Sequence, residues 1–126
     1  MIKPEAIIDG FTGPIIEEIE KAGFKIIQLK KVKLSKSEAE RFYSIHQGKP
    51  FFDNLIEYMT SGEIIPMILE KDHAVEDYRR LIGNTNPEKA EEGTIRKKYA
   101  KSMTSNAVHG SDSDENAQLE ADFFFD

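Results

Sequence analysis

Short segments with helical periodicity alternate with strand-like runs along the whole chain, and this alternation limits the fold more than any other feature. Apolar side chains recur at helical spacing in five segments, residues 14–23, 35–46, 49–62, 73–83 and 114–125. Strand-like runs occupy residues 1–3, 24–34, 63–71 and 101–110. The order β-α-β-α-α-β-α-loop-β-α predicts an α/β (α+β) sandwich, a ferredoxin-like four-stranded antiparallel sheet with helices packed on it.

Local signals mark where these segments begin and end. Ser35 followed by Glu38 forms a capping box, which predicts a helix start, and Gly23 favours a helix end. Pro14 suits the first helical position, and Asp112 or Ser113 is expected to cap the last helix. Apolar alternation slips in phase within residues 24–34, and residues 84–102 have little periodicity, which predicts an imperfect strand and a functional loop.

Length and composition narrow the class of protein. The 126 residues suit one domain, residues 1–126, which we expect to be short at both termini, because Pro4 interrupts the first strand and the chain stops at an apolar cluster. The absence of cysteine excludes disulfides and thiolate metal sites. No apolar run is long enough for a membrane span, and no signal peptide opens the chain, so a cytoplasmic protein is expected. The net charge of −6 argues against broad nucleic-acid binding.

Residue types suited to phosphate chemistry lie at the ends of the regular segments or between them. Phosphoryl transfer needs cations and hydrogen-bond donors directed at oxygens, together with an in-line nucleophile. The candidates are Lys3, Arg79, Thr85, Arg96, Asn106 and His109.

Taken singly, each candidate has an ordinary structural explanation. An arginine near a helix C-terminus, such as Arg79, usually interacts with the helix dipole. Thr85 suits a turn, and Asn106 suits local backbone hydrogen bonds. His46 and His73 lie in charged helical contexts and are expected at the surface. No single residue therefore identifies a site.

Several familiar catalytic motifs are missing. The chain has no GxxxxGK[ST] phosphate loop and no HExxH pair for zinc. The segment HGSDS matches neither a nucleophile elbow nor an ordered Ser/His/Asp set, so hydrolysis has no support.

The ordered combination of short blocks, however, resembles the nucleoside diphosphate kinase family from Lys3 to the final phenylalanines. The most specific block is NAVHGSDS, which matches the family signature N-x-x-H-G-S-D-S around His109. The other blocks follow the family's order: MIKPEA, AGFKI, FYSIHQGKPFF, YMTSG, LIGNTNP and GTIR.

This resemblance implies reversible transfer of the terminal phosphate of a nucleoside triphosphate to a nucleoside diphosphate through a phosphohistidine. His109 matches the family's nucleophile, and a neutral imidazole is nucleophilic near neutral pH. Tyr43 and Glu120 match residues that flank and orient this histidine, and Ser111 is expected beside them.

The resemblance also implies how the nucleotide is held. Phe51 would stack on the base, which accepts any base, and Asn106 would contact the sugar. Contacts to the phosphates are implied for Lys3, Arg79, Thr85 and Arg96. No direct protein ligand to a metal is expected: Mg²⁺ would be bound mainly through the nucleotide phosphates, with Asp112 supporting it through water.

The resemblance also predicts an oligomer, and the chain differs from the family pattern at Glu5. Family members form tetramers or hexamers, so a homo-oligomer is expected, with residues 83–93 contributing to subunit contacts. Glu5 replaces the commoner aspartate of the KPDA block, a mild change.

Three alternatives remain open at this point. A catalytically weak nucleotide-binding or regulatory relative would be expected to lack His109 or one of the phosphate cations, and this chain lacks neither. A nucleic-acid-binding role is disfavoured by the net charge of −6. A phosphocarrier would also use a histidine but would not need Phe51 or Asn106 to hold a nucleoside.

Overall fold

The computed structural model describes residues 1–125 and contains two β-strands, seven α-helices and two short 3₁₀ turns within them. The strands are β1 (Lys25–Leu29) and β2 (Met67–Glu70). The helices are α1 (Pro4–Ile8), α2 (Thr12–Lys21), α3 (Lys36–Phe42), α4 (Phe52–Met59), α5 (Ala74–Ile82), α6 (Ile95–Tyr99) and α7 (Asp114–Phe125). The 3₁₀ turns are η1 (Ser44–His46) and η2 (Pro87–Lys89).

The sheet is antiparallel and contains fewer full strands than the sequence predicts. Only β1 and β2 form a ladder, while Ile2 joins the sheet through single bridges to Ile65 and Val108. From one edge to the other, the order is the segment of Val108, the segment of Ile2, β2 with Ile65, and β1, which is the ferredoxin-like order, so the fold class is confirmed in part. Four full strands are not found among residues 1–125, because the segments around Ile2 and Val108 contribute one bridging residue each.

Several local predictions are confirmed in atomic detail. The Ser35 hydroxyl accepts a hydrogen bond from the Glu38 backbone N–H, and the Glu38 carboxylate accepts one from the Ser35 N–H, which completes the capping box. The phase slip in the first strand-like run corresponds to a bulge between Ile26 and Gln28. At the last helix, Ser113 rather than Asp112 accepts from the N–H of Asn116 and acts as the cap.

Three boundaries differ from the predictions. Helix α2 begins at Thr12, so Pro14 is its third residue and not its first. Pro4 opens α1, a helix that was not predicted, because a proline after a strand-like run signals the end of a strand as well as the start of a helix. Residues 84–102 are not a continuous loop, because they contain η2 and α6, the latter capped by the Thr94 hydroxyl.

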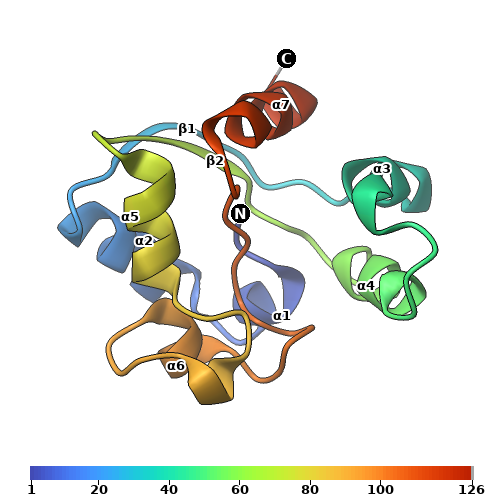
Figure 1. Cartoon of the computed structure of the whole chain (residues 1–126), viewed down its shortest axis with the longest axis horizontal. Helices are drawn as coiled ribbons and strands as arrows, with labels where there is room; N and C mark the ends of the chain where they lie inside the picture. Colours follow the sequence, from blue (N-terminus) through green and yellow to red (C-terminus); the bar gives the residue numbers. More distant parts are fainter. Residues whose placement is uncertain (126) are drawn as a thin grey trace.

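The helices divide into two groups with a separate apolar core beneath each. In Figure 1, α2, α5 and α6 lie at one end of the molecule and α3 and α4 at the other, with the chain between α6 and α7 running through the middle. One core is centred on Ile15, Ile19 and Ile95, and the other on Ile56, Met59 and Ile64. Among the helices of residues 1–125, none combines the length and apolar character that a bilayer crossing requires.

Candidate functional site

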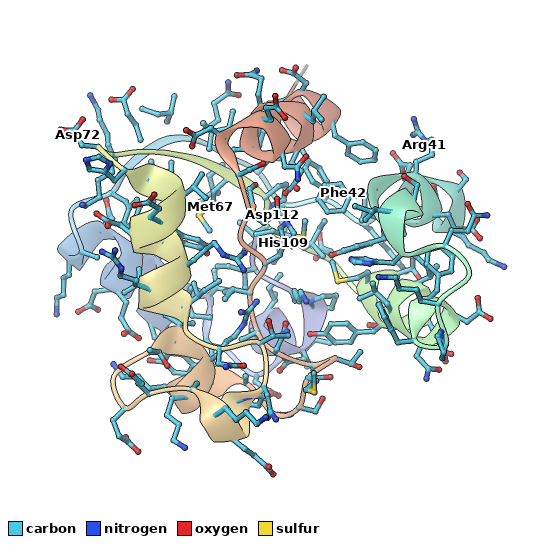
Figure 2. All side chains as sticks on the ribbon, in the orientation of Figure 1. Arg41, Phe42, Met67, Asp72, His109 and Asp112 are labelled. Carbon is cyan, nitrogen blue, oxygen red and sulfur yellow. The ribbon has the colours of Figure 1, made fainter. Side chains whose placement is uncertain are left out.

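His109 lies at the centre of the molecule, where the sheet meets the C-terminal helix (Figure 2). Its backbone N–H donates to the carbonyl of Met1 at 2.9 Å, so the first residues of the chain fix its position. Its ring nitrogen Nε2 lies 2.6 Å from Oε1 of Glu120 on α7, and the Ser111 hydroxyl donates to the same oxygen at 2.8 Å. The predicted grouping of His109, Ser111 and Glu120 therefore exists in the structure.

Burial controls the protonation of this group. Desolvation lowers the pKa of His109 below its usual value, although the hydrogen bond with Glu120 opposes this effect. Burial also disfavours the charge on Glu120, but the hydrogen bonds from His109 and Ser111 outweigh it and keep the pKa of Glu120 below its usual value. At neutral pH the arrangement therefore pairs a neutral imidazole with a carboxylate.

Aromatic rings enclose one side of His109. Phe42 meets the imidazole edge-on with 5.5 Å between ring centroids, and Figure 2 shows both residues near the centre of the molecule. Tyr43 meets it edge-on at 6.3 Å and is itself buried, which raises the pKa of its hydroxyl. Tyr43 therefore lies beside the histidine as predicted, whereas Phe42 was not predicted.

The same rings connect His109 with Phe51. His46 stacks against Tyr43 at 6.4 Å between centroids and contacts Phe51 at 5.3 Å. Phe51 itself is 45% exposed, so its face is available to a flat ligand. Of the two histidines expected at the surface, His73 is exposed, but His46 is half-buried in this row, with a buried Nδ1.

Three polar side chains are buried beneath the histidine segment. Nζ of Lys3 donates to the side-chain oxygen of Asn106 at 2.7 Å. The Arg96 guanidinium donates to two backbone carbonyls of the same segment, that of Asn106 at 3.3 Å and that of Val108 at 2.9 Å. The predicted residues Lys3, Arg96 and Asn106 therefore form one connected network.

This network is rich in uncompensated positive charge. Desolvation, followed by repulsion from Arg96, lowers the pKa of Lys3 to about 7. Desolvation lowers the pKa of Arg96 to about 10. The charge of Arg79 also lowers the pKa of Arg96. Cations whose charge is disfavoured by burial and by a neighbouring cation favour the binding of an anion, which would stabilise their charged forms.

Arg79 and Thr85 lie on the outer side of the same network. Together with Arg96 they line a cavity of about 580 Å³ between α5 and the segment that precedes α6. Both are exposed, and Nη1 of Arg79 is 3.4 Å from the carbonyl of Gly110, next to His109. The structure thus places a polar cavity lined by three arginines, Arg79, Arg80 and Arg96, beside the histidine segment.

A second, apolar cavity lies on another side of the histidine. It measures about 150 Å³, and Met67, Tyr78 and Phe124 line it with His109 and Glu120. Because none of its lining residues is a lysine or an arginine, it does not match the requirements of a phosphate.

No metal cage accompanies these residues. Within residues 1–125, no three acidic or histidine side chains come together as metal ligands. Asp112 is exposed beside the site, and a hydrogen bond from Asn116, reinforced by the charge of Arg79, lowers its pKa. The donor set therefore suits a metal that arrives with ligands of its own.

The geometry defines what the site can do chemically. It combines an oriented neutral imidazole, buried cations directed at one region, a cavity beside them and an exposed aromatic face reached through neighbouring rings. Such a set can accept a phosphoryl group on nitrogen while cations stabilise the oxygens.

Comparisons with known proteins agree with this chemistry. The family model described as "Nucleoside diphosphate kinase" matches residues 1–126. A nucleoside diphosphate kinase of Flavobacterium psychrophilum is 54% identical over 125 residues, which cover 99% of this chain and 90% of that protein. A nucleoside diphosphate kinase of Chlorobium limicola is 50% identical over 125 residues, which cover 99% of this chain and 89% of that protein.

Solved structures give the same result. The nucleoside diphosphate kinase of Aquifex aeolicus superimposes with a TM-score of 0.96 at 36% identity, covering 99% of this chain and 91% of that one. The nucleoside diphosphate kinase of Halobacterium salinarum, solved in complex with CDP, superimposes with a TM-score of 0.95 at 34% identity. The match covers 99% of this chain and 84% of that one. The resemblance seen in the sequence is confirmed, and the chain belongs to the nucleoside diphosphate kinase family.

Proposed function

We propose that this chain transfers the γ-phosphate of a nucleoside triphosphate, typically ATP, to a nucleoside diphosphate, reversibly and through phosphorylated His109. The observation that carries the proposal is the bond between Nε2 of His109 and Glu120, 2.6 Å long. Because this bond occupies Nε2, the nitrogen left to act as nucleophile is Nδ1, for which residues 1–125 supply no hydrogen-bond partner.

The reaction proceeds in two balanced half-steps. The lone pair of His109 Nδ1 attacks the γ-phosphorus, the bond from that phosphorus to the β,γ-bridging oxygen breaks, and the nucleoside diphosphate leaves with the electron pair. A second diphosphate then attacks the phosphohistidine, the N–P bond breaks, and the imidazole recovers its lone pair. Glu120 stabilises the positive charge that the ring acquires while phosphorylated, since its carboxylate accepts a hydrogen bond from the Nε2–H group.

The cations hold the phosphates in line with the ring. Lys3 and Arg96 contribute from the buried network, and Arg79 and Thr85 from the neighbouring cavity. Lys3 and Arg96 are held by hydrogen bonds before substrate arrives, so they stabilise the charge on the transferred group with little reorganisation.

The nucleoside is held by less specific contacts. Phe51 offers an exposed ring for stacking on the base, and Asn106 binds the sugar. Stacking on a π-face tolerates any base, so one site serves purine and pyrimidine nucleotides alike. Tyr43 supports the imidazole from the side, as does Ser111 through Glu120.

Magnesium fits this site as a companion of the nucleotide. The nucleotide phosphates would be its main ligands, and Asp112, an exposed carboxylate near Arg79, would support it through water. When bound, Mg²⁺ neutralises part of the phosphate charge.

Assembly into a homo-oligomer, a tetramer or hexamer, is part of the proposal. Within residues 1–125, β1 forms a ladder on one edge only, with β2, and it exposes Ile27 by 46% and Leu29 by 43%. An edge strand with exposed apolar side chains is stabilised when another chain covers it. Light scattering after size-exclusion chromatography measures the assembly directly.

The experiment that tests the catalytic proposal is a labelling and chase. Purified chain is incubated with γ-labelled ATP and Mg²⁺, and we expect a label on protein that is acid-labile and alkali-stable. Addition of GDP or dTDP should remove the label and yield the corresponding triphosphate. His109→Ala should acquire no label, and His73→Ala, which alters an exposed histidine remote from the site, should label normally.

Two outcomes would contradict the proposal. Full nucleotide exchange by His109→Ala would exclude the phosphohistidine route. A label that no nucleoside diphosphate removes would instead indicate a phosphocarrier.

A further inference from the structure

Ala107 adopts a backbone conformation that residues with a β-carbon rarely occupy. Its φ is 73°, in the left-handed region, and the residue is fully buried. It lies between Asn106 and Val108, whose polar groups contact Lys3 and Arg96, and two residues before His109. The direction of the chain at Ala107 therefore determines where both Asn106 and His109 lie.

Such a conformation persists only when neighbouring groups hold it in place. The carbonyl of Ala107 accepts from the backbone N–H of Lys3 at 2.9 Å. Its N–H donates to the carboxylate oxygen Oε1 of Glu5 at 3.1 Å, and the hydroxyl of Tyr58 donates to that same oxygen, also at 3.1 Å. Both polar backbone groups of Ala107 are thus bound by residues at the start of the chain.

We propose that Glu5 is a positioning residue for phosphoryl transfer, because its carboxylate oxygen holds Ala107 in the left-handed conformation and thereby aims Asn106 and His109. This inference rests on the proposed function of His109. Glu5 forms no hydrogen bond or ion pair with the imidazole or the buried cations; its charge raises the pKa of Lys3, but its contact with the site is through the backbone of Ala107.

The contact requires a hydrogen-bond acceptor and not a negative charge. Burial raises the pKa of Glu5, so its surroundings do not favour ionisation, although the donors Tyr58 and Ala107 oppose this effect. A glutamine side chain keeps an acceptor oxygen of the same reach without the charge. The variants Glu5→Gln and Glu5→Ala therefore separate the proposed role from a purely electrostatic one.

The test measures the rate of phosphohistidine formation in a single turnover, at a temperature where each variant is folded by circular dichroism. We expect Glu5→Ala to slow this step by roughly tenfold to a hundredfold, because small misplacement of a reacting group has effects of that size. We expect Glu5→Gln to remain within about threefold of the unaltered chain, since the acceptor persists.

A second variant tests the link to Ala107 itself. Glycine occupies the left-handed region without strain, so Glu5→Ala combined with Ala107→Gly should label faster than Glu5→Ala alone. The matched control is Asp9→Ala, which removes an ion pair with Lys101, 2.7 Å long, from the residue that ends the same helix. It should label at the rate of the unaltered chain even where its Tm falls.

The results test the positioning role of Glu5 separately from the proposed function of His109. Equal losses in Glu5→Ala and Glu5→Gln, no loss in either, or no gain from Ala107→Gly would overturn the positioning role. Labelling of the unaltered chain and its absence in His109→Ala report on the proposed function alone.

Discussion

The imidazole of His109 and the carboxylate of Glu120 are joined by a contact of 2.6 Å between Nε2 and Oε1, although they lie eleven residues apart and on different elements. The helix α7 is what brings the carboxylate to the ring. A carboxylate in this position fixes the tautomer of the imidazole and stabilises its charged form.

The first prediction concerns this pair. Glu120→Gln should lower kcat by about tenfold to a hundredfold, the usual effect of removing a partner that orients a functional histidine. Glu115→Gln, on the first turn of the same helix and exposed, serves as the matched control and should leave kcat unchanged. Steady-state kinetics under saturating nucleotide measure both. Equal kcat values for the two variants would show that Glu120 does not orient the nucleophile.

The second prediction concerns the acid side of the pH profile. Because burial lowers the pKa of His109 below its usual value, the ring stays neutral to lower pH than a free histidine. The neutral form is the nucleophile, so the rate of phosphohistidine formation should rise with pH and reach half its maximum below about pH 6.5, the usual pKa of histidine. Rapid-quench labelling across pH 4.5–8 measures this limb. A midpoint above the usual pKa of histidine would contradict the prediction.

The third prediction concerns the alkaline side. Lys3 has a pKa of about 7 in the nucleotide-free chain, mainly through desolvation, so it loses its charge as pH rises above this value. A bound phosphate restores the charged form. We therefore expect kcat/KM, which reports the free enzyme, to fall above about pH 7, while kcat stays level. The same decline in kcat would show that Lys3 does not recover its charge on nucleotide binding.

The fourth prediction concerns base stacking. Phe51→Ala should raise KM for all nucleotides by a similar factor, about fivefold to over a hundredfold, because stacking contributes about 1–3 kcal/mol whatever the base. Ile45→Ala, which alters a side chain that is 78% exposed in the same region, is the control and should not change KM. A loss confined to purines or to pyrimidines would indicate recognition by hydrogen bonds instead.

The sequence predicted the parts of the fold that depend on local chemistry. The capping box of Ser35 and Glu38 and the bulge after Ile26 both follow from neighbours in the chain. The number of strands could not be predicted from local sequence, because a strand requires a hydrogen-bonded partner along its whole length. The segments of Ile2 and Val108 pair with a neighbour at a single residue each. Helix α6 also escaped prediction, since its five residues are too few for a clear period.

The site shows the same division. His109 and its predicted neighbours came from the resemblance of short motifs. The structure places Glu120 within hydrogen-bond distance of His109, and Ser111 within hydrogen-bond distance of Glu120. Phe42 and His46 were missed because their ring contacts arise only when α3 and η1 pack against the histidine segment. No spacing in the sequence encodes such contacts.

The last prediction concerns Gly83, whose φ of 88° and ψ of −172° form a conformation that is essentially restricted to glycine. A β-carbon there would lie 2.7 Å from the hydroxyl oxygen of Thr94, whereas one at Gly48, with a φ of +86°, would meet nothing within 4 Å. Both Gly83→Ala and Gly48→Ala impose backbone strain of about 1–3 kcal/mol because of their positive φ, but only the first adds steric overlap, about 1–3 kcal/mol more. A change of about 1 kcal/mol shifts the Tm by roughly 3–5 °C, so Gly83→Ala should have the lower Tm by scanning calorimetry. Equal Tm values for the two variants would show that Thr94 moves aside without cost.

Gly83→Ala should also weaken nucleotide binding, because the carbonyl of Gly83 accepts a hydrogen bond from Nη1 of Arg96 at 3.0 Å.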